Sequence, residues 1–368
     1  MNLLFYIALF LLFIALLRFL IALLNFLTRP VLPFGKPDEH PLVSVLIPAR
    51  NEEKNIGILI QGLLKQTYWN IEVIVYDDLS IDQTPNIVNE FVNGDNRVKM
   101  IRGDGLPKGW LGKNYACHRL AQSANGEYLL FLDADVAVST FFVKNALAYM
   151  QRKRLVLLTM FPKQKLVSFG EQLVVPTMNW ILLSLLFLRL VRWSKRRSLA
   201  AANGQMMMFN AEVYKQYQWH ELVKTSAVED ITISRMIKRR KLRMATLLGT
   251  DDVSCRMYGS YSEAIIGFTK NVTAFFGGSL IATSIFALIG TIGPIIAILG
   301  LPFPLALLYF FSLISARLLI SRLSEQSLFI NVVLWPVQHL SFLHLVYNAF
   351  SYKRKKQLIW KGRDVGKV

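Results

Sequence analysis

Cysteine is scarce in this sequence: Cys117 and Cys255 are the only two in 368 residues. Because they lie in very different sequence contexts, they indicate neither a disulfide framework nor a cysteine metal site, and they fit a reducing cytosol. The histidines show no metal-ligand spacing with a cysteine pair. The sequence also contains no internal repeat, which excludes solenoid and propeller architectures.

Acidic residues are few relative to basic ones, with 24 Asp and Glu against 42 Lys and Arg, for a net charge of +18. Such an excess can indicate nucleic-acid binding. Here the basic residues cluster beside apolar blocks, as in Arg192–Arg197 and Lys353–Lys356. This pattern is typical of a cytoplasmic membrane face in contact with anionic lipid. The sequence therefore predicts a membrane partner and no nucleic-acid partner.

Long apolar runs are abundant, since 53% of the residues are hydrophobic and they concentrate at the two ends of the chain. The first run, Leu3–Leu27, is long enough to span a bilayer as a helix. It lacks the basic start and the small-residue cleavage site of a signal peptide, so we expect a retained anchor. Arg18, Arg29 and Lys36 lie toward or beyond its C-terminal end. This bias predicts a cytoplasmic domain after the anchor, with the Arg18 side chain reaching toward that face.

Between the apolar ends, short apolar runs alternate with helical patterns, which predicts an α/β domain with a mostly parallel sheet. The expected strands are Leu42–Ile47, Ile71–Tyr76, Val98–Ile101, Tyr128–Leu132, Leu155–Met160, Gln205–Phe209 and Leu242–Leu247. The expected helices are Lys54–Lys65, Thr84–Val92, Asn114–Ser123, Thr140–Met150 and Asp230–Arg239.

From Thr273 onward, the sequence contains three further apolar runs. The turn Gly300–Pro304 between the first two carries no charge, which predicts that these two runs form a membrane hairpin. For the third run, Leu328–Phe350, we expect a membrane-embedded or interfacial position. The predicted organisation is a multi-pass inner-membrane protein with a cytoplasmic α/β domain. Its parts are a transmembrane anchor (1–28), a linker (29–41), the α/β domain (42–271) with an interfacial apolar segment (172–191), C-terminal membrane segments (272–350) and a basic cytoplasmic tail (351–368).

The buried strand Tyr128–Leu132 ends in two carboxylates, Asp133 and Asp135, separated by the small Ala134. Ligands of open α/β sheets bind beyond the carboxyl ends of the strands. Side chains alternate along an extended chain, so both carboxylates fall on one side and can share a hard cation through oxygen ligands. This stretch predicts a divalent-metal site.

Three more polar motifs occur in a fixed order around it. Pro48-Ala49-Arg50-Asn51-Glu52-Glu53 follows the first strand, Asp77-Asp78 follows the second, and Glu229-Asp230 lies far downstream. Each also allows a purely structural interpretation, as a turn capped by Asn51, a turn capped by Asp82 or a helix-capping acid at Asp230. Taken together, the four ordered motifs resemble the family 2 glycosyltransferases, over roughly Leu42–Tyr261.

The resemblance implies an inverting enzyme with the GT-A fold that uses a UDP- or GDP-sugar donor. It implies that Asp77 or Asp78 binds the nucleotide base, that Asp135 binds Mn²⁺ or Mg²⁺ and that Asp133 contacts ribose or metal. Asp230 is implied as the base that deprotonates the acceptor, with Glu229 positioning it. The remaining donor-binding residues implied by the motifs are Pro48, Ala49, Arg50, Glu52, Lys113 and Ala134.

Two further sequence features indicate which members of the family this sequence resembles most. Pro107–Asn114 offers glycines, a helix start and Lys113 to a diphosphate, and it is similar to the carotenoid- and hopanoid-associated, lipid-modifying members. The Gln-x-x-Arg-Trp motif of processive polysaccharide synthases is absent. The region where that motif would lie contains Arg256-Met257-Tyr258 and Gly267–Asn271, and the tail contains Trp360-Lys361-Gly362-Arg363. The basic and aromatic residues of these stretches could close over the diphosphate or anchor the chain at the membrane surface.

The sequence therefore predicts transfer of one sugar to a carotenoid-, hopanoid- or glycerolipid-like acceptor at the cytoplasmic leaflet. Two alternatives stay open. One is a polyprenyl-phosphate acceptor, which is already ionised and needs no base. The other is a non-catalytic membrane scaffold that binds nucleotide or lipid. A transporter is disfavoured because too few spans are present and none carries paired internal charges.

Overall fold

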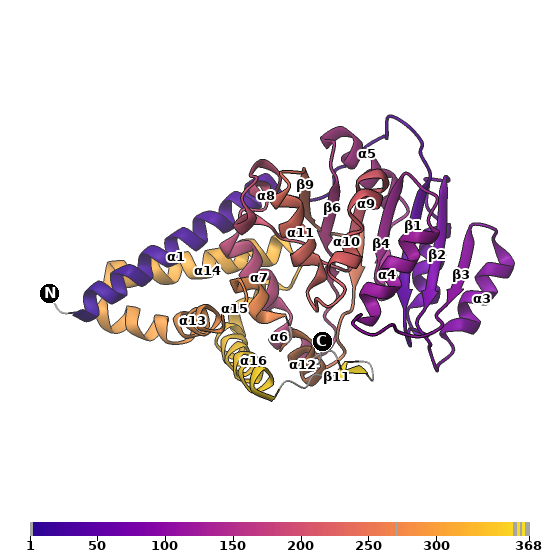
Figure 1. Ribbon diagram of the computed structural model, residues 1–368. Coiled ribbons are helices and arrows are strands. Elements are labelled where there is room, and N and C mark those ends of the chain that lie inside the picture. The colour runs from indigo at the N-terminus through magenta and orange to yellow at the C-terminus, as the bar shows by residue number, and fades with distance from the viewer. Residues whose placement is uncertain (1–2, 270, 356–358, 361–362, 365–368) are drawn as a thin grey trace. The chain divides into compact units, whose positions relative to one another are not determined.

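The computed structural model describes residues 3–269, 271–355, 359–360 and 363–364, and the chain forms two compact units (Figure 1). The sheet unit comprises Val31–Lys165, Arg189–Arg256 and Ile359–Val368. The helical unit comprises Met1–Pro30, Leu166–Leu188 and Met257–Leu358.

The sheet unit is built on a seven-stranded sheet in which the described strands follow the order β3-β2-β1-β4-β8-β6-β9. All the predicted strands are present, with small shifts at their ends. They are β1 (Val43–Ala49), β2 (Ile71–Asp77), β3 (Val98–Arg102), β4 (Tyr128–Leu132), β6 (Leu157–Phe161), β8 (Met206–Asn210) and β9 (Met244–Leu248). The predicted helices are also present, as α2 (Ile56–Leu64), α3 (Thr84–Gly94), α4 (Gly112–Ser123), α5 (Phe142–Lys153) and α11 (Glu229–Arg239).

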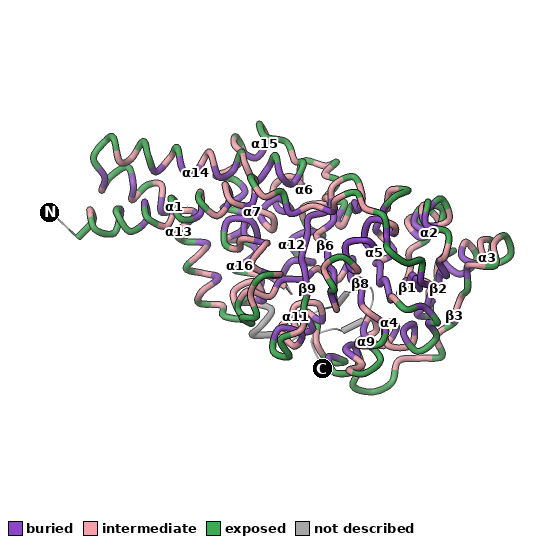
Figure 2. The backbone as a smooth tube through the Cα atoms, turned by 90° about the horizontal axis from the view of Figure 1, so that it is seen from above, coloured by how far each residue is buried: buried purple, intermediate pink, exposed green. Residues whose placement is uncertain are grey.

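Burial explains the continuous apolar runs of the central strands. β2 is buried along its whole length and β1 nearly so, as the purple tube in Figure 2 shows. Strands covered by helices on both faces lose the alternation of a half-exposed sheet. β1 pairs in parallel with both β2 and β4, so the carboxyl ends of all three strands meet at one edge of the sheet.

The expectation of a mostly parallel sheet is confirmed, with one reversal that affects the candidate site. β8 runs antiparallel to both β4 and β6, and Leu132 at the end of β4 pairs with Met206 at the start of β8. The residues just before β8 therefore reach the same edge as the residues just after β4. A second sheet, in the order β5-β10-β7, contains β5 (Val136–Val138), β10 (Val253–Cys255) and β7 (Lys163–Gln164).

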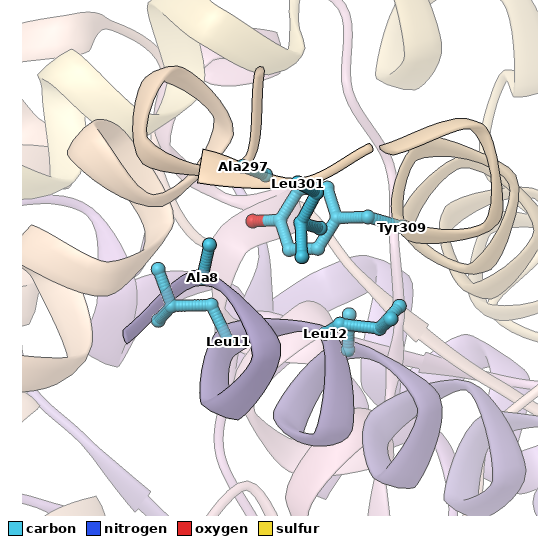
Figure 3. Packing of buried hydrophobic residues seen from close by; sticks show 7 residues of the cluster. Ala8, Leu11, Leu12, Ala297, Leu301 and Tyr309 are labelled. Carbon is cyan, nitrogen blue, oxygen red and sulfur yellow. The ribbon is translucent and has the colours of Figure 1, made fainter. Parts of the chain in front are cut away.

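The helical unit contains three described helices that are long and apolar enough to cross a membrane. They are α1 (Leu3–Thr28), α13 (Leu280–Gly300) and α14 (Phe303–Leu323). At about 1.5 Å per residue, 21 residues reach roughly 32 Å, which matches the ~30 Å hydrocarbon core of a bilayer. In Figure 3, Ala8, Leu11 and Leu12 of α1 face Ala297, Leu301 and Tyr309, and these apolar contacts pack α1 against the α13–α14 pair.

The apolar segment near residues 172–191 and the third C-terminal run are not among these three helices. Residues 169–185 form α6 (Phe169–Val174) and α7 (Pro176–Leu185). The third C-terminal run is broken into α15 (Leu328–Val333) and α16 (Trp335–Lys355), with Pro336 in the first turn of α16. Proline fits a first helical turn but not a helix interior, because it has no backbone N–H. The interfacial location of 172–191 and the domain limits given above stay predictions.

Two arginines of the helical unit, Arg18 of α1 and Arg317 of α14, have buried side chains. Lys270, and part of the basic tail with Lys361 and Gly362, lie outside the described residues.

Candidate active site

The two carboxylates after β4 lie at the sheet edge as predicted, and Gln205, the residue just before β8, holds both. The backbone N–H of Asp133 donates to the Gln205 carbonyl at 3.1 Å. The Gln205 side-chain amide donates to the Asp135 carboxylate, with Nε2 3.3 Å from Oδ1. Ala134 between them is buried. The antiparallel pairing of β4 with β8 thus fixes the orientation of both aspartates.

Lys113, in the first turn of α4, joins two of the predicted motifs. Its Nζ lies 2.8 Å from Asp133 Oδ1 and 3.2 Å from Glu229 Oε1. It also donates to the Gly204 carbonyl at 3.2 Å. Residues far apart in sequence, in α4, after β4 and at the start of α11, therefore meet around one ammonium group.

Asp230 follows Glu229 in the first turn of α11 and accepts two backbone hydrogen bonds. Gly204 N donates to Oδ2 at 2.9 Å, and Ile231 N donates to Oδ1 at 2.7 Å. The N-cap of α11 is Val228, so Asp230 is not the cap residue. The helix N-terminus stabilises the negative charge, and the two bonds hold the carboxylate in one orientation.

Gly204 was not predicted from the sequence, and its backbone completes the cluster. A Cβ at this position would lie 2.7 Å from Glu229 Oε1 and 3.1 Å from Lys113 Nζ, so a side chain would displace the ion pair. Gln205 was also missed as a site residue, although it was expected to begin a strand. A strand running antiparallel to β4 would have placed its first residues beside Asp133, but nothing in the local pattern specified that direction.

The pKa values of three carboxylates of the site are shifted in different directions. Burial, together with the charge of Glu229, raises the pKa of Asp230 to about 7. Burial, then the charges of Asp133 and Glu52, raise the pKa of Asp135 to about 7. Burial also acts to raise the pKa of Glu229, but the attraction of Lys113 outweighs it, so that pKa lies below its ordinary value. Glu229 is therefore a stable counter-charge, whereas Asp230 can exchange a proton near neutral pH.

The loops after β1 and β2 form a second group, held together by backbone contacts. Arg50 Nη1 donates to the Asp78 carbonyl at 2.6 Å, and Asp78 N donates to the Ala49 carbonyl at 2.8 Å. Asp77 and Asp78 are both buried. Pro48 and Ala49 lie inside β1, paired with Tyr76 and Asp77, so the strand extends beyond its predicted end. Glu52, in the loop after β1, contributes to the potential at Asp133 and Asp135.

The geometry does not support a cap at Asn51, because the N-cap of α2 is Asn55. The N-cap position of α3 is Gln83, but the Asp82 carboxylate accepts from Thr84 N, the first residue of α3, at 3.0 Å. Asn51 instead links the loops, accepting from Ile81 N at 3.0 Å while its own N–H donates to Ser80 Oγ at 3.0 Å.

The carboxylate oxygens of the site suit a hard cation that is also coordinated by a bound ligand. Among the described residues, no group of three or more His, Cys, Asp or Glu side chains forms a complete metal cage. Asp133 and Asp135 nevertheless supply two carboxylates. Burial, then the charges of Asp133 and Glu52, raise the pKa of Asp135, and a bound cation would favour its ionised form. Magnesium and similar ions are commonly bound by one or two carboxylates together with substrate phosphates. The residues therefore fit a divalent ion that arrives with a phosphorylated ligand.

The chain is similar to known proteins in sequence and in fold. The model of the family "Glycosyl transferase family 2" matches residues 44–217. A 4,4'-diaponeurosporenoate glycosyltransferase of Staphylococcus haemolyticus is 27% identical over 350 residues, covering 88% of each chain. A protein of the same name from Staphylococcus aureus is 27% identical over 270 residues, covering 71% of this chain and 69% of that protein.

A solved structure supports the fold. A mannosyltransferase from Pyrobaculum calidifontis, in complex with GDP-Man and Mn²⁺, superposes with a TM-score of 0.52 at 16% identity. The match covers 92% of this chain and 99% of that one. The likeness establishes the GT-A fold for the chain.

Proposed function

Residues 44–217 belong to the family 2 glycosyltransferases, and we propose that this glycosyltransferase moves one sugar, with inversion, from a UDP- or GDP-sugar to a membrane lipid acceptor. The acceptor class is carotenoid-, hopanoid- or glycerolipid-like. The observation that carries the proposal is the cluster in which Lys113 joins Asp133 to Glu229, with Asp230 held beside it by Gly204. It combines a site for a diphosphate with a carboxylate whose pKa suits proton transfer.

The proposed reaction is a direct displacement. The acceptor oxygen forms a bond to the anomeric carbon while the bond from that carbon to the diphosphate oxygen breaks, and the electron pair leaves with the nucleoside diphosphate. Asp230 accepts the proton of an acceptor hydroxyl, because its pKa of about 7 leaves a large ionised fraction at neutral pH. Glu229 remains ionised beside Lys113 and keeps that lysine in place.

The leaving diphosphate needs positive charge. Asp133 and Asp135 would hold Mn²⁺ or Mg²⁺, which would neutralise the charge that develops on the leaving group. Lys113 contributes a second positive charge in the same cluster. In the loops after β1 and β2, Asp77 or Asp78 would accept hydrogen bonds from the nucleotide base, with Pro48, Ala49, Arg50 and Glu52 lining the donor site.

A lipid acceptor is supported by the helical unit and by the relatives. In the described part of the chain, three helices are apolar enough to span a membrane, and the matched Staphylococcus proteins are named for an apolar carotenoid acid. An acceptor dissolved in the bilayer is concentrated at a membrane-anchored enzyme. From the basic residues after α1 and around Arg192–Arg197, we further propose a multi-pass inner-membrane protein with a cytoplasmic catalytic domain.

The test is sugar transfer by purified full-length protein in detergent, with UDP- and GDP-sugars, Mn²⁺ or Mg²⁺, and pairs of lipid alcohols and lipid acids. We expect transfer from one donor class to at least one lipid, stopped by a chelator. An absence of turnover despite metal-dependent donor binding, with every lipid tried, would favour the non-catalytic scaffold.

The Asp230→Asn variant separates the acceptor classes. A hydroxyl acceptor needs the base, so the variant should lose about 10²–10⁴-fold in rate. A carboxylate or a polyprenyl phosphate is already ionised, so its glycosylation should fall far less. The exposed Asp251, whose side chain is 90% accessible, supplies the control variant Asp251→Asn, which should retain full activity with either class.

A further inference from the structure

Two arginines lie buried inside the helical unit, in helices that are apolar enough to span a membrane. Arg18 of α1 is 6% exposed and Arg317 of α14 is 5% exposed. At about 1.5 Å per residue, Arg18 lies roughly 15 Å from the C-terminal end of α1. A charge at such depth in a bilayer is costly, at about 2.5–3.5 kcal/mol on insertion scales, so it usually faces a partner or a functional site.

Both guanidinium groups pack on the same indole ring. The Cζ atoms of Arg18 and Arg317 lie 4.3 and 4.7 Å from the centroid of the Trp180 ring, in α7. The Cζ of Arg18 also lies 4.6 Å from the ring centroid of Phe286. Cation–π contacts stabilise the arginines, but they do not neutralise two positive charges held close together.

The polar partners of the arginines are neutral. Arg18 donates from Nε and Nη2 to Ser184 Oγ at 3.2 and 3.0 Å. Arg317 donates to the Asn331 carbonyl at 3.1 Å and to Gln338 Oε1 at 2.8 Å, and its Nη2 lies 3.2 Å from His339 Nε2. Within the described part of the chain, no carboxylate lies within ion-pair distance of these two arginines. The cluster therefore carries positive charge that no carboxylate among the described residues offsets.

The same cluster has an excess of hydrogen-bond donors. Trp180 Nε1 and Arg317 Nε are buried and have no hydrogen-bond partner among the described residues. A cavity of about 10 Å³, which is roughly the space of one water-sized group, lies against Arg18 and Trp180, and apolar side chains form most of its remaining wall. These include Leu11, Ile14, Ile289 and Leu313. Buried donors without partners call for an explanation, and an anion bound beside them is one.

We propose that the Arg18–Trp180–Arg317 cluster binds the oxyanion group, a carboxylate or a phosphate, at the end of an apolar lipid chain. The oxyanion would accept from the indole N–H and the guanidinium groups, and the chain would lie along the apolar helices. A small hydrophilic anion is a poor occupant, because it would lose its hydration without apolar contacts in return. This site goes beyond the proposed sugar transfer, because it lies within the helical unit and needs no sugar donor.

The first test compares acids with their neutral analogues on the wild-type protein. Equilibrium binding to full-length protein in nonionic detergent would be measured at pH 8, without nucleotide sugar, for hexadecanoic acid against its methyl ester and for hexadecyl phosphate against hexadecanol. We expect at least one anion to bind tenfold or more tightly than its neutral partner, and the tighter of the two anions identifies the lipid class. Equal binding within both pairs would overturn the proposal.

Single substitutions then test which residues cause the preference for the anionic lipid over its neutral analogue. Arg18→Gln should abolish the preference for the anion, and Trp180→Phe, which keeps a ring but removes the N–H, should reduce it. Arg322→Gln, at an exposed position near the end of α14, should leave the preference unchanged. An intact preference in a folded Arg18→Gln protein would contradict the proposal.

Should Arg18→Gln fail to fold, photocrosslinking on the wild-type protein decides the question. A fatty acid carrying a diazirine should label peptides that contain Leu11, Ile14 or Ile289, and excess unlabelled acid, but not its ester, should suppress the labelling. Labelling confined to other segments would rule the site out. Because these measurements involve no turnover, their failure would leave the proposed glycosyl transfer untouched.

Discussion

At the scale of single residues, Asp230 is the group through which pH should act on the reaction. Its raised pKa has two causes, burial and the charge of Glu229, while Ile231 N, Gly204 N and Lys113 favour the ionised form. The balance places the pKa at about 7. Glu229 stays ionised in this range, so Asp230 is the carboxylate of this pair that titrates near neutral pH.

For a hydroxyl acceptor, kcat/KM at saturating Mn²⁺ should therefore rise about tenfold per pH unit below 7 and level off above it, because the base must be ionised. For a carboxylate or phosphate acceptor the profile should stay nearly flat across the same range. The measurement is initial rate against pH at low acceptor concentration. A rate with a lipid alcohol that does not change between pH 5.5 and 8 would exclude Asp230 as the base.

Lys113 is the residue whose removal should cost the most stability in this site. The change Lys113→Gln leaves Asp133 and Glu229 without their common cation, and breaking a buried ion pair costs about 3–5 kcal/mol. Because the lysine is partly exposed, we expect the low end, with a clear decrease in Tm that Mn²⁺ partly reverses. Lys163→Gln, which removes a pair with the exposed Asp251, should cost less than about 1 kcal/mol. Equal Tm values for the two variants would refute this role of Lys113.

At the scale of elements, the loops after β1 and β2 act as one unit because their contacts run between them. Glu52 N donates to Thr84 Oγ1 at 2.7 Å and Glu53 N to Asp82 Oδ2 at 3.1 Å, in addition to the bonds of Asn51. Asn51 itself has a φ of +53°, in the left-handed region that disfavours most side chains. The residue thus combines a rare backbone conformation with the link to Ile81.

Asn51→Ala should lower the free energy of unfolding by about 2–3 kcal/mol, from about 1–2 kcal/mol of backbone strain and about 1 kcal/mol for the lost hydrogen bond. Asn51→Gly keeps the backbone conformation available and should lose less. Thermal or denaturant unfolding, with nucleotide binding measured in parallel, gives the comparison. The exposed Asn86→Ala should change stability by less than about 0.5 kcal/mol. Glycine and alanine variants of equal stability would show that the backbone conformation is not the cause.

The existence of the elements could be predicted from the sequence, because hydrophobic periodicity records burial on each face of a helix or strand. The direction of β8 could not, since Gln205–Phe209 is equally apolar whichever way it runs. That direction brings Gly204 and Gln205 to the site. Three of the four motifs were visible because they follow strands whose ends meet, and the fourth, Glu229-Asp230, was visible as an acidic pair at a predicted helix start. The partners of Lys113 were not visible, because they depend on contacts between residues about 20 and 116 positions away along the chain.

At the scale of the whole molecule, the proposed cytoplasmic placement of the sheet unit can be tested with cysteine labelling. Cys117 and Cys255 are buried, and burial raises the pKa of both thiols, so they should react slowly with maleimide. Lys195→Cys, at an exposed position of the sheet unit, should be protected from an impermeant maleimide in right-side-out vesicles. Pro302→Cys, in the exposed turn between α13 and α14, should be labelled. The reverse pattern would contradict the inside placement of basic residues.

The most direct test of the central claim is sugar transfer from a nucleotide donor to a lipid by the purified full-length Asp135→Asn variant beside the wild type. If Asp133 and Asp135 hold the divalent ion that neutralises the leaving diphosphate, wild-type transfer should require Mn²⁺ or Mg²⁺. The variant should then lose transfer at least a hundredfold with every acceptor, while Asp251→Asn remains fully active. Wild-type transfer that persists in excess chelator, or an Asp135→Asn variant with unimpaired transfer, would contradict the account.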